Sequence, residues 1–282
     1  MRTLHALLIV MILITSLPVF ASDTYQLSML PRYSSEEINR RITPLVEYLK
    51  QKTGVTIEGI ITSNFALYEQ QLKSGAIEFG YENPYIYTLV SETHEVVAMA
   101  SKGKDNAKFR GIIIVRKDSG LTKVNALKGK NIAIVGYTSA GGYLSQKLTL
   151  VQAGINVETD CTLTEAVENK QENVILSVYT GEVDAGFIRE SALHQADRYI
   201  AASQIRVLSE TAWLPNWAFS VKRDLPERLK KSIQTVLISL EPNHAVMKAL
   251  KIDAFIMATD GDYNIVRQAA GTLGDATPSK SN

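Results

Sequence analysis

Two hydrophobic periodicities alternate along this chain, the two-residue period of a strand and the three- to four-residue period of a helix. The alternation begins with a strand pattern at residues 25–30 and continues with an amphipathic helix that ends at Gly54. Further strands are predicted at 55–61 and 77–81, and further helices at 65–72 and 84–90. Alternating strands and helices predict a parallel sheet with right-handed crossover connections.

The same pattern restarts in the middle of the chain. The second set has strands at 111–116, 132–135, 183–187 and 205–209, and helices at 166–180 and 190–196. A strand at 218–221 and a helix at 226–240 follow, in a final segment that is expected to return to the first set. The chain therefore forms two α/β lobes, and it is expected to cross between them twice, near 104–111 and 211–215. Two lobes with paired crossovers form a hinge around a cleft, and such proteins close on small ligands.

The turn after the strand at 132–135 is rich in small and hydroxylated residues. Helical spacing resumes directly after it, and the first amides of a helix have no internal partners and carry partial positive charge. Thr138 and Ser139 add hydroxyl donors, while Gly141 and Gly142 let the backbone approach a ligand closely. The turn therefore favours an anion site, and a turn that only caps a helix is the alternative.

The first 21 residues have the pattern of a secretory signal peptide. Arg2 precedes an apolar stretch from Leu7 to Leu17, and a small-residue cleavage pattern ends at Ala21. We expect cleavage after Ala21 and a periplasmic protein, with an uncleaved anchor as the alternative. Cys161 is the only cysteine, so no intrachain disulfide and no lipid attachment after the signal are expected.

Charge and metal-ligand patterns exclude several classes of function. The chain has 30 basic and 29 acidic residues, and removal of Arg2 with the signal leaves 29 of each. This balance argues against a nucleic-acid partner or a polybasic membrane surface. The four histidines lack the spacing of a zinc helix, and Cys161 has no nearby partner. We expect no metal and no cofactor, and a monomer.

Six segments of the chain form a recognisable pattern. No single segment is decisive, but their order and spacing together are specific. They are residues 30–49, 78–87, 111–119, 127–130, 181–186 and 260–263. Among them are Gly181-Glu-Val-Asp-Ala-Gly186 and Asp260-Gly-Asp-Tyr263. Together they resemble the periplasmic substrate-binding proteins for phosphate, phosphite and phosphonate uptake, the PhnD-like group, over roughly residues 26–267.

This resemblance implies a type II periplasmic binding protein fold of the α/β class, with two crossovers that form a hinge around a ligand cleft. The first lobe would comprise residues 22–108 and 215–282, and the second lobe residues 109–214. The resemblance further implies a protein without catalytic residues. It would capture a small oxyanion by hinge closure and deliver the ligand to the permease of an ABC transporter.

The chain departs from the family at the turn described above. Family members often have Ser-Thr-Ser-Gly or Ser-Ala-Ser-Gly where this chain has Ser139-Ala-Gly-Gly142. Ser139 and Gly142 match, whereas Ala140 and Gly141 lack hydroxyls. Because a hydrogen bond to a charged group contributes about 1.5–3 kcal/mol, the departure predicts weaker phosphonate binding or another ligand, unless Thr138 or backbone amides substitute.

Three further candidate contacts lie where strands of the first lobe end. Tyr33 follows the first strand, and Tyr81 and Asn83 flank the turn after the strand at 77–81. Open α/β sheets bind ligands at the carboxyl ends of their strands, so these side chains are expected in the cleft. An exposed loop tyrosine is the alternative for Tyr33.

Two candidates flank the strand at 183–187 in the second lobe. Asp184 could accept a hydrogen bond from a ligand amine or hydroxyl, with a capping carboxylate as the alternative. Arg189 has the fixed fork that suits phosphate or carboxylate, with a surface ion pair as the alternative. Trp213 and Trp217 flank Pro215 at the second crossover, where core packing is favoured over a place in the cleft.

Two other functional classes fit the same pattern. A periplasmic sensor of a non-phosphonate ligand would have the same lobes and would signal to a membrane receptor kinase. A serine hydrolase would use Ser139 and a histidine, and only His194 occurs in the second lobe. The turn also lacks the lysine of a nucleotide P-loop and the spacing of a nucleophile elbow. The sequence therefore favours a binding protein that is not an enzyme.

Overall fold

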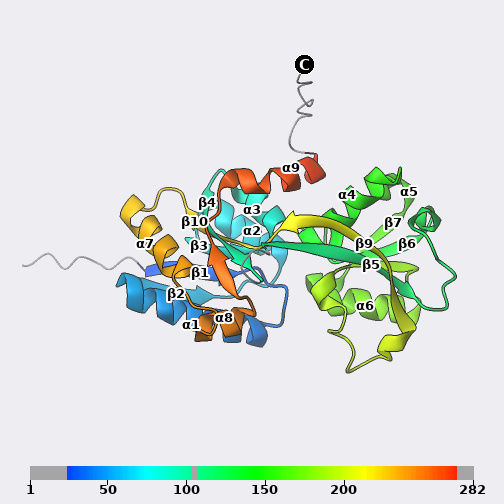
Figure 1. Ribbon diagram of the computed structural model, residues 1–282, viewed down its shortest axis with the longest axis horizontal. Helices are drawn as coiled ribbons and strands as arrows, with labels where there is room; N and C mark the ends of the chain where they lie inside the picture. The colour runs from blue at the N-terminus through cyan, green and yellow to red at the C-terminus, as the bar shows by residue number, and fades with distance from the viewer. Residues whose placement is uncertain (1–23, 103–106, 272–282) are drawn as a thin grey trace, which may run out of the picture.

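The computed structural model describes residues 24–102 and 107–271, so the predicted signal peptide at 1–21 lies outside the described residues. The chain folds around two mixed sheets that are flanked by helices and lie side by side (Figure 1). Here the six-stranded sheet with its helices is named the first lobe, and the five-stranded sheet with its helices the second lobe. The predicted two-lobed α/β fold class is confirmed.

The first lobe combines the N-terminal part of the chain with its C-terminal part. Its elements are β1 (Thr24–Met29), α1 (Ser35–Thr53), β2 (Thr56–Ile60), α2 (Phe65–Lys73), β3 (Phe79–Glu82), α3 (Pro84–Val90), β4 (His94–Ser101), β10 (Ala218–Lys222), α7 (Glu227–Ile238), α8 (Ala245–Leu250), β11 (Ala254–Ile256) and α9 (Asn264–Ala270). The strand order is β11-β4-β10-β3-β1-β2. Most of the predicted elements are present, but β4, α8, β11 and α9 were not predicted.

The second lobe consists of the middle of the chain. Its elements are β5 (Lys108–Arg116), β6 (Asn131–Ile134), α4 (Ser145–Gln152), α5 (Val157–Asp160), β7 (Thr162–Glu165), α6 (Gln171–Thr180), β8 (Ala185–Arg189) and β9 (Ile205–Pro215). The strand order is β7-β6-β8-β5-β9. The helix predicted at 190–196 is only a 3-10 turn, Glu190–Ala192, without a side-chain cap, and so short a helix is marginal by itself.

The expectation of purely parallel sheets is wrong. β1 pairs in parallel with β2 and β3, and β6 pairs in parallel with β7 and β8. However, β10 runs antiparallel to β3 and β4, and β5 runs antiparallel to β8 and β9. β5 and β10 are the strands by which the chain enters the second sheet and returns to the first, and β11 is also antiparallel to β4. Strand and helix periodicity does not reveal these reversals of direction.

The strands β5 and β9 connect the two lobes as a long antiparallel pair. Their register extends from Lys108 opposite Pro215 to Arg116 opposite Ile205, and Figure 1 shows them reaching from the centre of the molecule across the second lobe. On the return, only Asn216 and Trp217 separate the end of β9 from the start of β10. These two residues therefore lie at the connection between the sheets.

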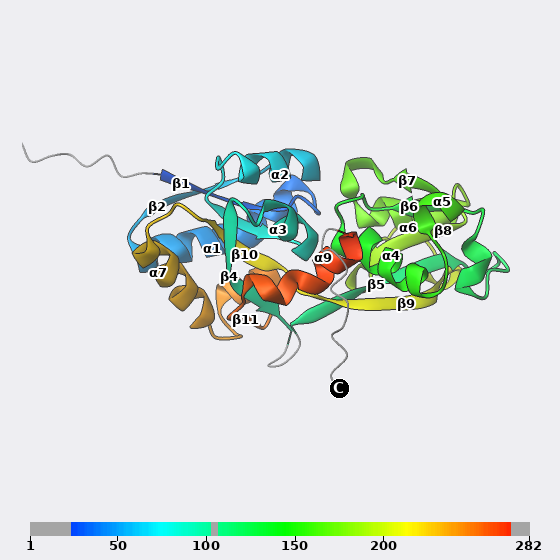
Figure 2. The ribbon, with the colours of Figure 1, turned by 90° about the horizontal axis from the view of Figure 1, so that it is seen from above.

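The last helix, α9, contacts both lobes behind this connection. It packs against α3 of the first lobe and against α4 and β9 of the second (Figure 2). A buried apolar cluster joins Val266 and Ala269 of α9 to Leu144, and the neighbouring Tyr263 hydroxyl donates a hydrogen bond to the Asn216 carbonyl oxygen at 3.2 Å. No helix in residues 24–102 or 107–271 is long and apolar enough to cross a membrane.

Candidate functional site

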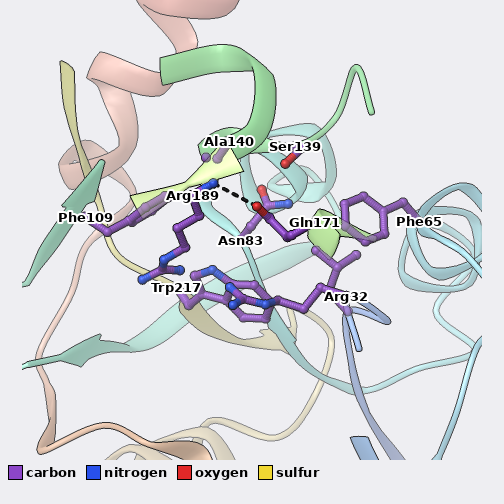
Figure 3. Close-up of a pocket in the computed structure, with 11 residues that line it drawn as sticks. Arg32, Phe65, Asn83, Phe109, Ser139, Ala140, Gln171, Arg189 and Trp217 are labelled. Carbon is purple, nitrogen blue, oxygen red and sulfur yellow. Dashed lines mark hydrogen bonds between the residues drawn. The ribbon is translucent and has the colours of Figure 1, made fainter. Parts of the chain in front are cut away.

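Two guanidinium groups, one from each lobe, lie in the cleft. Arg32 is in the loop between β1 and α1, and Arg189 is the last residue of β8. Both side chains line two adjoining cavities, a small one of about 10 Å³ (Figure 3) and a larger one of about 560 Å³. Within the described residues, neither arginine forms an ion pair with a carboxylate. The cleft thus contains two positive charges for which the described part of the chain provides no counterion.

Aromatic rings, rather than acidic side chains, hold these guanidiniums in place. The Arg32 Cζ atom lies 4.5 Å from the ring centroid of Tyr33 and 5.2 Å from that of Trp217. The Arg189 Cζ atom lies 4.0 Å from the ring centroid of Phe109. Cation–π contacts of this kind fix the plane of a guanidinium and leave the N–H groups at its edge free.

Few of those N–H groups have protein partners. Arg32 Nη2 donates to the Tyr33 hydroxyl at 2.5 Å, and its buried Nε has no hydrogen-bond partner among the described residues. Arg189 Nη2 donates to the Asn216 side-chain oxygen at 3.3 Å. Since buried polar groups are almost always hydrogen-bonded, the remaining donors point to a ligand that accepts several hydrogen bonds.

The electrostatics of the cleft favour an anion. Burial lowers the pKa of Arg189 to about 9, and the charge of Arg32 adds to this effect. Burial alone would raise the pKa of Tyr33, but the nearby cations Arg32, Arg41, Arg189 and Lys251 together lower it. Arg189 is still charged at neutral pH, so a bound anion would relieve an unfavourable burial of charge.

The small-residue turn at 138–142 adopts a kinked conformation. Ser139 Oγ accepts a hydrogen bond from the Gly142 amide at 3.1 Å, and residues 140–144 form a single π-type turn before α4 begins. Gly142 has non-helical angles, and a Cβ atom there would lie 2.3 Å from Val135. The small cavity beside Ser139 has room for about one water-sized group, which is less than a tetrahedral oxyanion needs.

Other predicted site residues meet where the lobes touch. Asn83 Nδ2 donates to the Thr138 carbonyl oxygen at 3.1 Å, while Asn83 Oδ1 caps α3. Tyr33 and Tyr81 line the larger cavity. The buried Tyr81 ring packs 5.2 Å from Trp217, and burial raises the pKa of its phenol. The structure therefore brings Tyr33, Tyr81, Asn83 and Ser139 together around Arg189.

Asp184 does not lie in the cleft, contrary to expectation. Its Oδ2 accepts a hydrogen bond from the Asn131 amide at 3.0 Å, and its Oδ1 lies 3.8 Å from Lys130 Nζ. It precedes β8, whereas Arg189 ends that strand, so the two residues lie at opposite ends of β8. Only the carboxyl ends of these parallel strands face the cleft. Asp184 is therefore the capping carboxylate that was given as the alternative, and it caps the Asn131 amide.

Several residues of the cleft were not predicted as ligand contacts. Gln171 Oε1 accepts a hydrogen bond from the Arg189 amide at 2.8 Å (Figure 3), and Trp217, for which core packing was favoured, is buried in the wall of both cavities. The position of Arg32 directly after the first strand was a usable signal, because Tyr33 was identified by the same rule. Lys170 and Gln171 gave no such signal, because the sequence placed them inside a helix that starts only at Gln171.

Lys170 links the lobes at this site. Its ammonium donates to the carbonyl oxygens of Tyr33 and, at 3.4 Å, of Pro31. With the bond from Asn83 to Thr138, it connects the first lobe to the second on the cleft side. The described structure is therefore a closed arrangement. In the described ranges, no group of three His, Cys, Asp or Glu side chains could hold a metal ion.

Known proteins were compared with the chain by sequence and by structure. The family described as "ABC transporter, phosphonate, periplasmic substrate-binding protein" matches residues 27–263. A phosphate-import protein PhnD of Mycolicibacterium smegmatis is 20% identical over 285 residues, which cover 89% of this chain and 86% of that protein.

Solved structures of similar proteins have the same fold. PhnD1 of Prochlorococcus marinus in complex with methylphosphonate superimposes with a TM-score of 0.77 at 14% identity, covering 89% of this chain and 99% of that chain. A binding protein component of an ABC phosphonate transporter from Pseudomonas aeruginosa gives a TM-score of 0.74 at 14% identity. The match covers 88% of this chain and 86% of that chain. At this identity the likeness establishes the fold alone.

Proposed function

Because this chain belongs to the family of periplasmic substrate-binding proteins of phosphonate ABC transporters, we propose that it binds a phosphonate-like oxyanion between Arg32 and Arg189. Membership in this family confirms the prediction of a binding component of an ABC transporter that is not an enzyme. One observation carries the assignment of the site: two guanidiniums from opposite lobes lie in one cleft, and no carboxylate of residues 24–102 or 107–271 forms an ion pair with either.

The site couples binding to closure through charge. In the closed arrangement the charge of Arg32 lowers the pKa of Arg189, which means that the two like charges repel one another. An oxyanion between them accepts hydrogen bonds from both and removes this repulsion. Ligand therefore favours the closed state by the difference in its affinity for the closed and open states.

The connection between the lobes takes part in the same site. Asn216, one of the two residues between β9 and β10, accepts a hydrogen bond from Arg189, and the other, Trp217, lies against Arg32. Rotation at this connection would move both contacts. We propose that hinge closure presents the loaded protein to the permease, with residues 22–108 and 215–282 as one moving unit and residues 109–214 as the other.

The finer assignments belong to the same proposal. The protein would be secreted with cleavage after Ala21, would act as a monomer and would bind no nucleic acid. The names of the similar proteins support an organophosphorus or phosphate ligand, since one is bound to methylphosphonate and another imports phosphate. The predicted contacts Tyr33, Tyr81, Asn83, Ser139 and Gly141 line the cavities beside the arginine pair and are included in the proposed site. Thr138 and Gly142 are included through their hydrogen bonds to Asn83 and Ser139.

Isothermal titration calorimetry on the mature chain, residues 22–282, tests this function. Methylphosphonate, phosphate and sulfate are titrated into the wild type and into Arg32→Met. We expect saturable one-to-one binding of a phosphorus oxyanion to the wild type. Loss of hydrogen bonds to a charged group should weaken it about tenfold or more in Arg32→Met. Absence of binding for all three anions, or equal affinity of the variant, would contradict the proposal.

A further inference from the structure

The larger cavity beyond the arginine pair exceeds the needs of a small oxyanion. Its volume is about 560 Å³, whereas one water molecule occupies about 30 Å³ in the liquid. Its charged lining has more cations than anions. The cations are Arg32, Arg41, Lys102, Arg189 and Lys251, and the acids are Glu37 and Glu172. Methylphosphonate on Arg32 and Arg189 would leave most of this volume and part of this charge unmatched.

The two acids of the cavity already interact with cations of the protein. Glu37 Oε1 lies 2.7 Å from Arg41 Nη2, and the same carboxylate also pairs with Arg40. Lys251 Nζ lies 3.9 Å from Glu37 Oε1, at the limit of an ion pair. Glu172 lies in the first turn of α6, where it interacts with the charge of Lys170. One carboxylate, that of Glu37, is thus shared by Arg40, Arg41 and Lys251, and the charged side chains that line the cavity carry a net positive charge.

Tyr33 contacts two of the cations that line the cavity. The Cζ atoms of Arg32 and Arg41 lie 4.5 Å and 4.2 Å from its ring centroid, so both guanidiniums are in contact with one ring. Its hydroxyl accepts a hydrogen bond from Arg32, and its own proton is left to donate. Tyr33 and Lys251 thus both line the larger cavity, and Lys251 is among the cations that act on the Tyr33 hydroxyl.

We propose that the ligand is a phosphonate with a second acidic group on a short carbon chain. The phosphonate would bind Arg32 and Arg189, and the second acid would reach the Tyr33 hydroxyl and the neighbourhood of Lys251. This inference rests on the proposed function, because it assumes that the first oxyanion occupies the arginine pair. It adds that the site selects against an amine at the far end of the chain.

Calorimetry with a matched series of phosphonates tests the second acid. The series is methylphosphonate, n-butylphosphonate, 3-phosphonopropionate and 2-aminoethylphosphonate, so that chain length and terminal charge vary separately. We expect 3-phosphonopropionate to bind about tenfold or more tighter than n-butylphosphonate, and 2-aminoethylphosphonate to bind weakest of the longer three. Equal affinity of the acid and the butyl compound, or preference for the amine, would overturn the inference while the proposed function stands.

A pair of lysine variants locates the second acid. Lys251 has positive φ, so Lys251→Asn removes the charge with a residue that tolerates this backbone conformation. Lys248→Asn, on an exposed position of α8 outside the cavity, is the matched control. We expect Lys251→Asn to weaken 3-phosphonopropionate about two- to fivefold, as for an exposed ion pair, and to leave methylphosphonate unchanged. An equal effect on both ligands, or the same effect in Lys248→Asn, would overturn the placement of the second acid.

If none of the four phosphonates binds, the proposed function itself fails, and the inference fails with it. If methylphosphonate binds but 3-phosphonopropionate does not bind more tightly than n-butylphosphonate, only the inference fails. Thermal unfolding of each variant without ligand shows whether a lost affinity reflects lost folding. Both lysine side chains are solvent-exposed, so their replacement should leave the unfolding temperature close to that of the wild type.

Discussion

Arg32 and Arg189 extend from different lobes into one cleft, where each guanidinium is held by aromatic rings and neither forms an ion pair with a carboxylate of the described chain. Buried charges in proteins are normally paired, because a charge out of water without a partner is costly. The missing counterion is therefore expected from the ligand. Because the two like charges repel one another, the closed protein has a less favourable free energy without ligand than with an anion bound between them.

Replacing Arg189 by Met should lower affinity and raise the stability of the ligand-free protein. The variant removes a buried cation whose pKa is lowered by burial, so the fold loses a destabilising charge while the ligand loses its donors. We expect roughly a 10- to 100-fold weaker Kd for methylphosphonate, together with a higher Tm without ligand. Calorimetry and thermal unfolding at pH 7 measure both.

The control for this variant is Arg198→Met, an exposed arginine of the same lobe that packs on Tyr199. It should leave both Kd and Tm nearly unchanged. A lower Tm of Arg189→Met without ligand would show that Arg189 serves the fold rather than the ligand.

Gly141 and Gly142 should respond to alanine in different ways. A Cβ atom at Gly141 would lie 2.9 Å from the Phe109 ring and 3.1 Å from Arg189 Cβ, so it would displace the stacked guanidinium. A Cβ atom at Gly142 would instead lie 2.3 Å from Val135 in the core of the second lobe. Gly141→Ala is expected mainly to weaken ligand binding, and Gly142→Ala to destabilise the fold by about 1–3 kcal/mol.

These two variants are each other's controls, because the residues are adjacent in the same turn. Kd from calorimetry and the free energy of unfolding from urea denaturation separate the two effects. If Gly142→Ala unfolded like the wild type, or Gly141→Ala bound ligand like the wild type, the assignment of the two glycines would be wrong.

Lys170→Met should weaken the closed state. The Lys170 ammonium donates to the carbonyl oxygens of Pro31 and Tyr33 in the other lobe, and these bonds form only when the lobes are closed. Loss of a charged donor across the cleft predicts about a tenfold weaker Kd, since closure then contributes less to binding. The solution radius of gyration of the loaded variant should also be larger than that of the loaded wild type in X-ray scattering.

Lys231→Met, at an exposed position of α7, removes the same charge far from the contact between the lobes and should change neither quantity. A Lys170→Met protein with wild-type affinity would show that the link between the lobes does not contribute to closure.

A buried polar group in the first lobe predicts a loss of stability at alkaline pH. Glu82 accepts a hydrogen bond from the Tyr68 hydroxyl at 2.9 Å, and burial raises its pKa to about 8. The folded protein therefore binds this proton more tightly than the unfolded chain does. The free energy of unfolding falls as pH rises from the ordinary glutamate pKa of 4.5 to about 8. In Glu82→Gln this part of the pH dependence should disappear.

Urea denaturation at pH 6 and at pH 8.5 measures the difference, and Glu47→Gln on the exposed face of α1 is the control. We expect the wild type and Glu47→Gln to lose stability between the two pH values by a larger amount than Glu82→Gln. Parallel pH profiles of all three proteins would show that Glu82 is ionised in the folded state at neutral pH.

His94 gives the opposite dependence in the acid range. Burial lowers its pKa to about 4, and its Nδ1 lies 3.1 Å from the Ser220 hydroxyl. The unfolded chain takes up this proton first, so stability is lost as pH falls from the ordinary histidine pKa of 6.5 toward 4. His94→Gln should flatten the acid limb of the stability profile measured by urea denaturation between pH 4 and 6.5, and an acid limb as steep as that of the wild type would contradict this prediction.

The sequence predicted most helices and strands well, because the signals for where they begin and end are local. Gly54, for example, ends α1 in the left-handed conformation as its position after the helical pattern indicated. The antiparallel return of β10 was not predictable in this way, since strand direction depends on how the chain crosses from the other lobe. The extent of β9 to Pro215 was missed for the same reason: a strand that joins two lobes has no single solvent face to give it a period.

The site was predictable only in part. Tyr33, Tyr81 and Arg189 were found because strand ends face the cleft, and the same rule, applied strictly, would have excluded Asp184. Arg32 also follows the first strand and could have been included by this rule, but the importance of this residue could not be read from the sequence. It depends on a neighbour far along the chain, on the rings of Tyr33 and Trp217, and on the lack of a carboxylate nearby, all of which arise from tertiary packing.

The two tryptophans of the chain have very different surroundings. Trp213 is 47% exposed and packs 4.7 Å from Arg110, whereas Trp217 is 5% exposed and lies beneath the Arg32 guanidinium at the connection between the lobes. Because indole emission responds to nearby charge and solvent, Trp217 is placed to change its fluorescence when an anion enters or the lobes separate. With Trp213 replaced by Phe, the protein would carry its own optical reporter, able to follow capture and release of ligand in real time without an added dye.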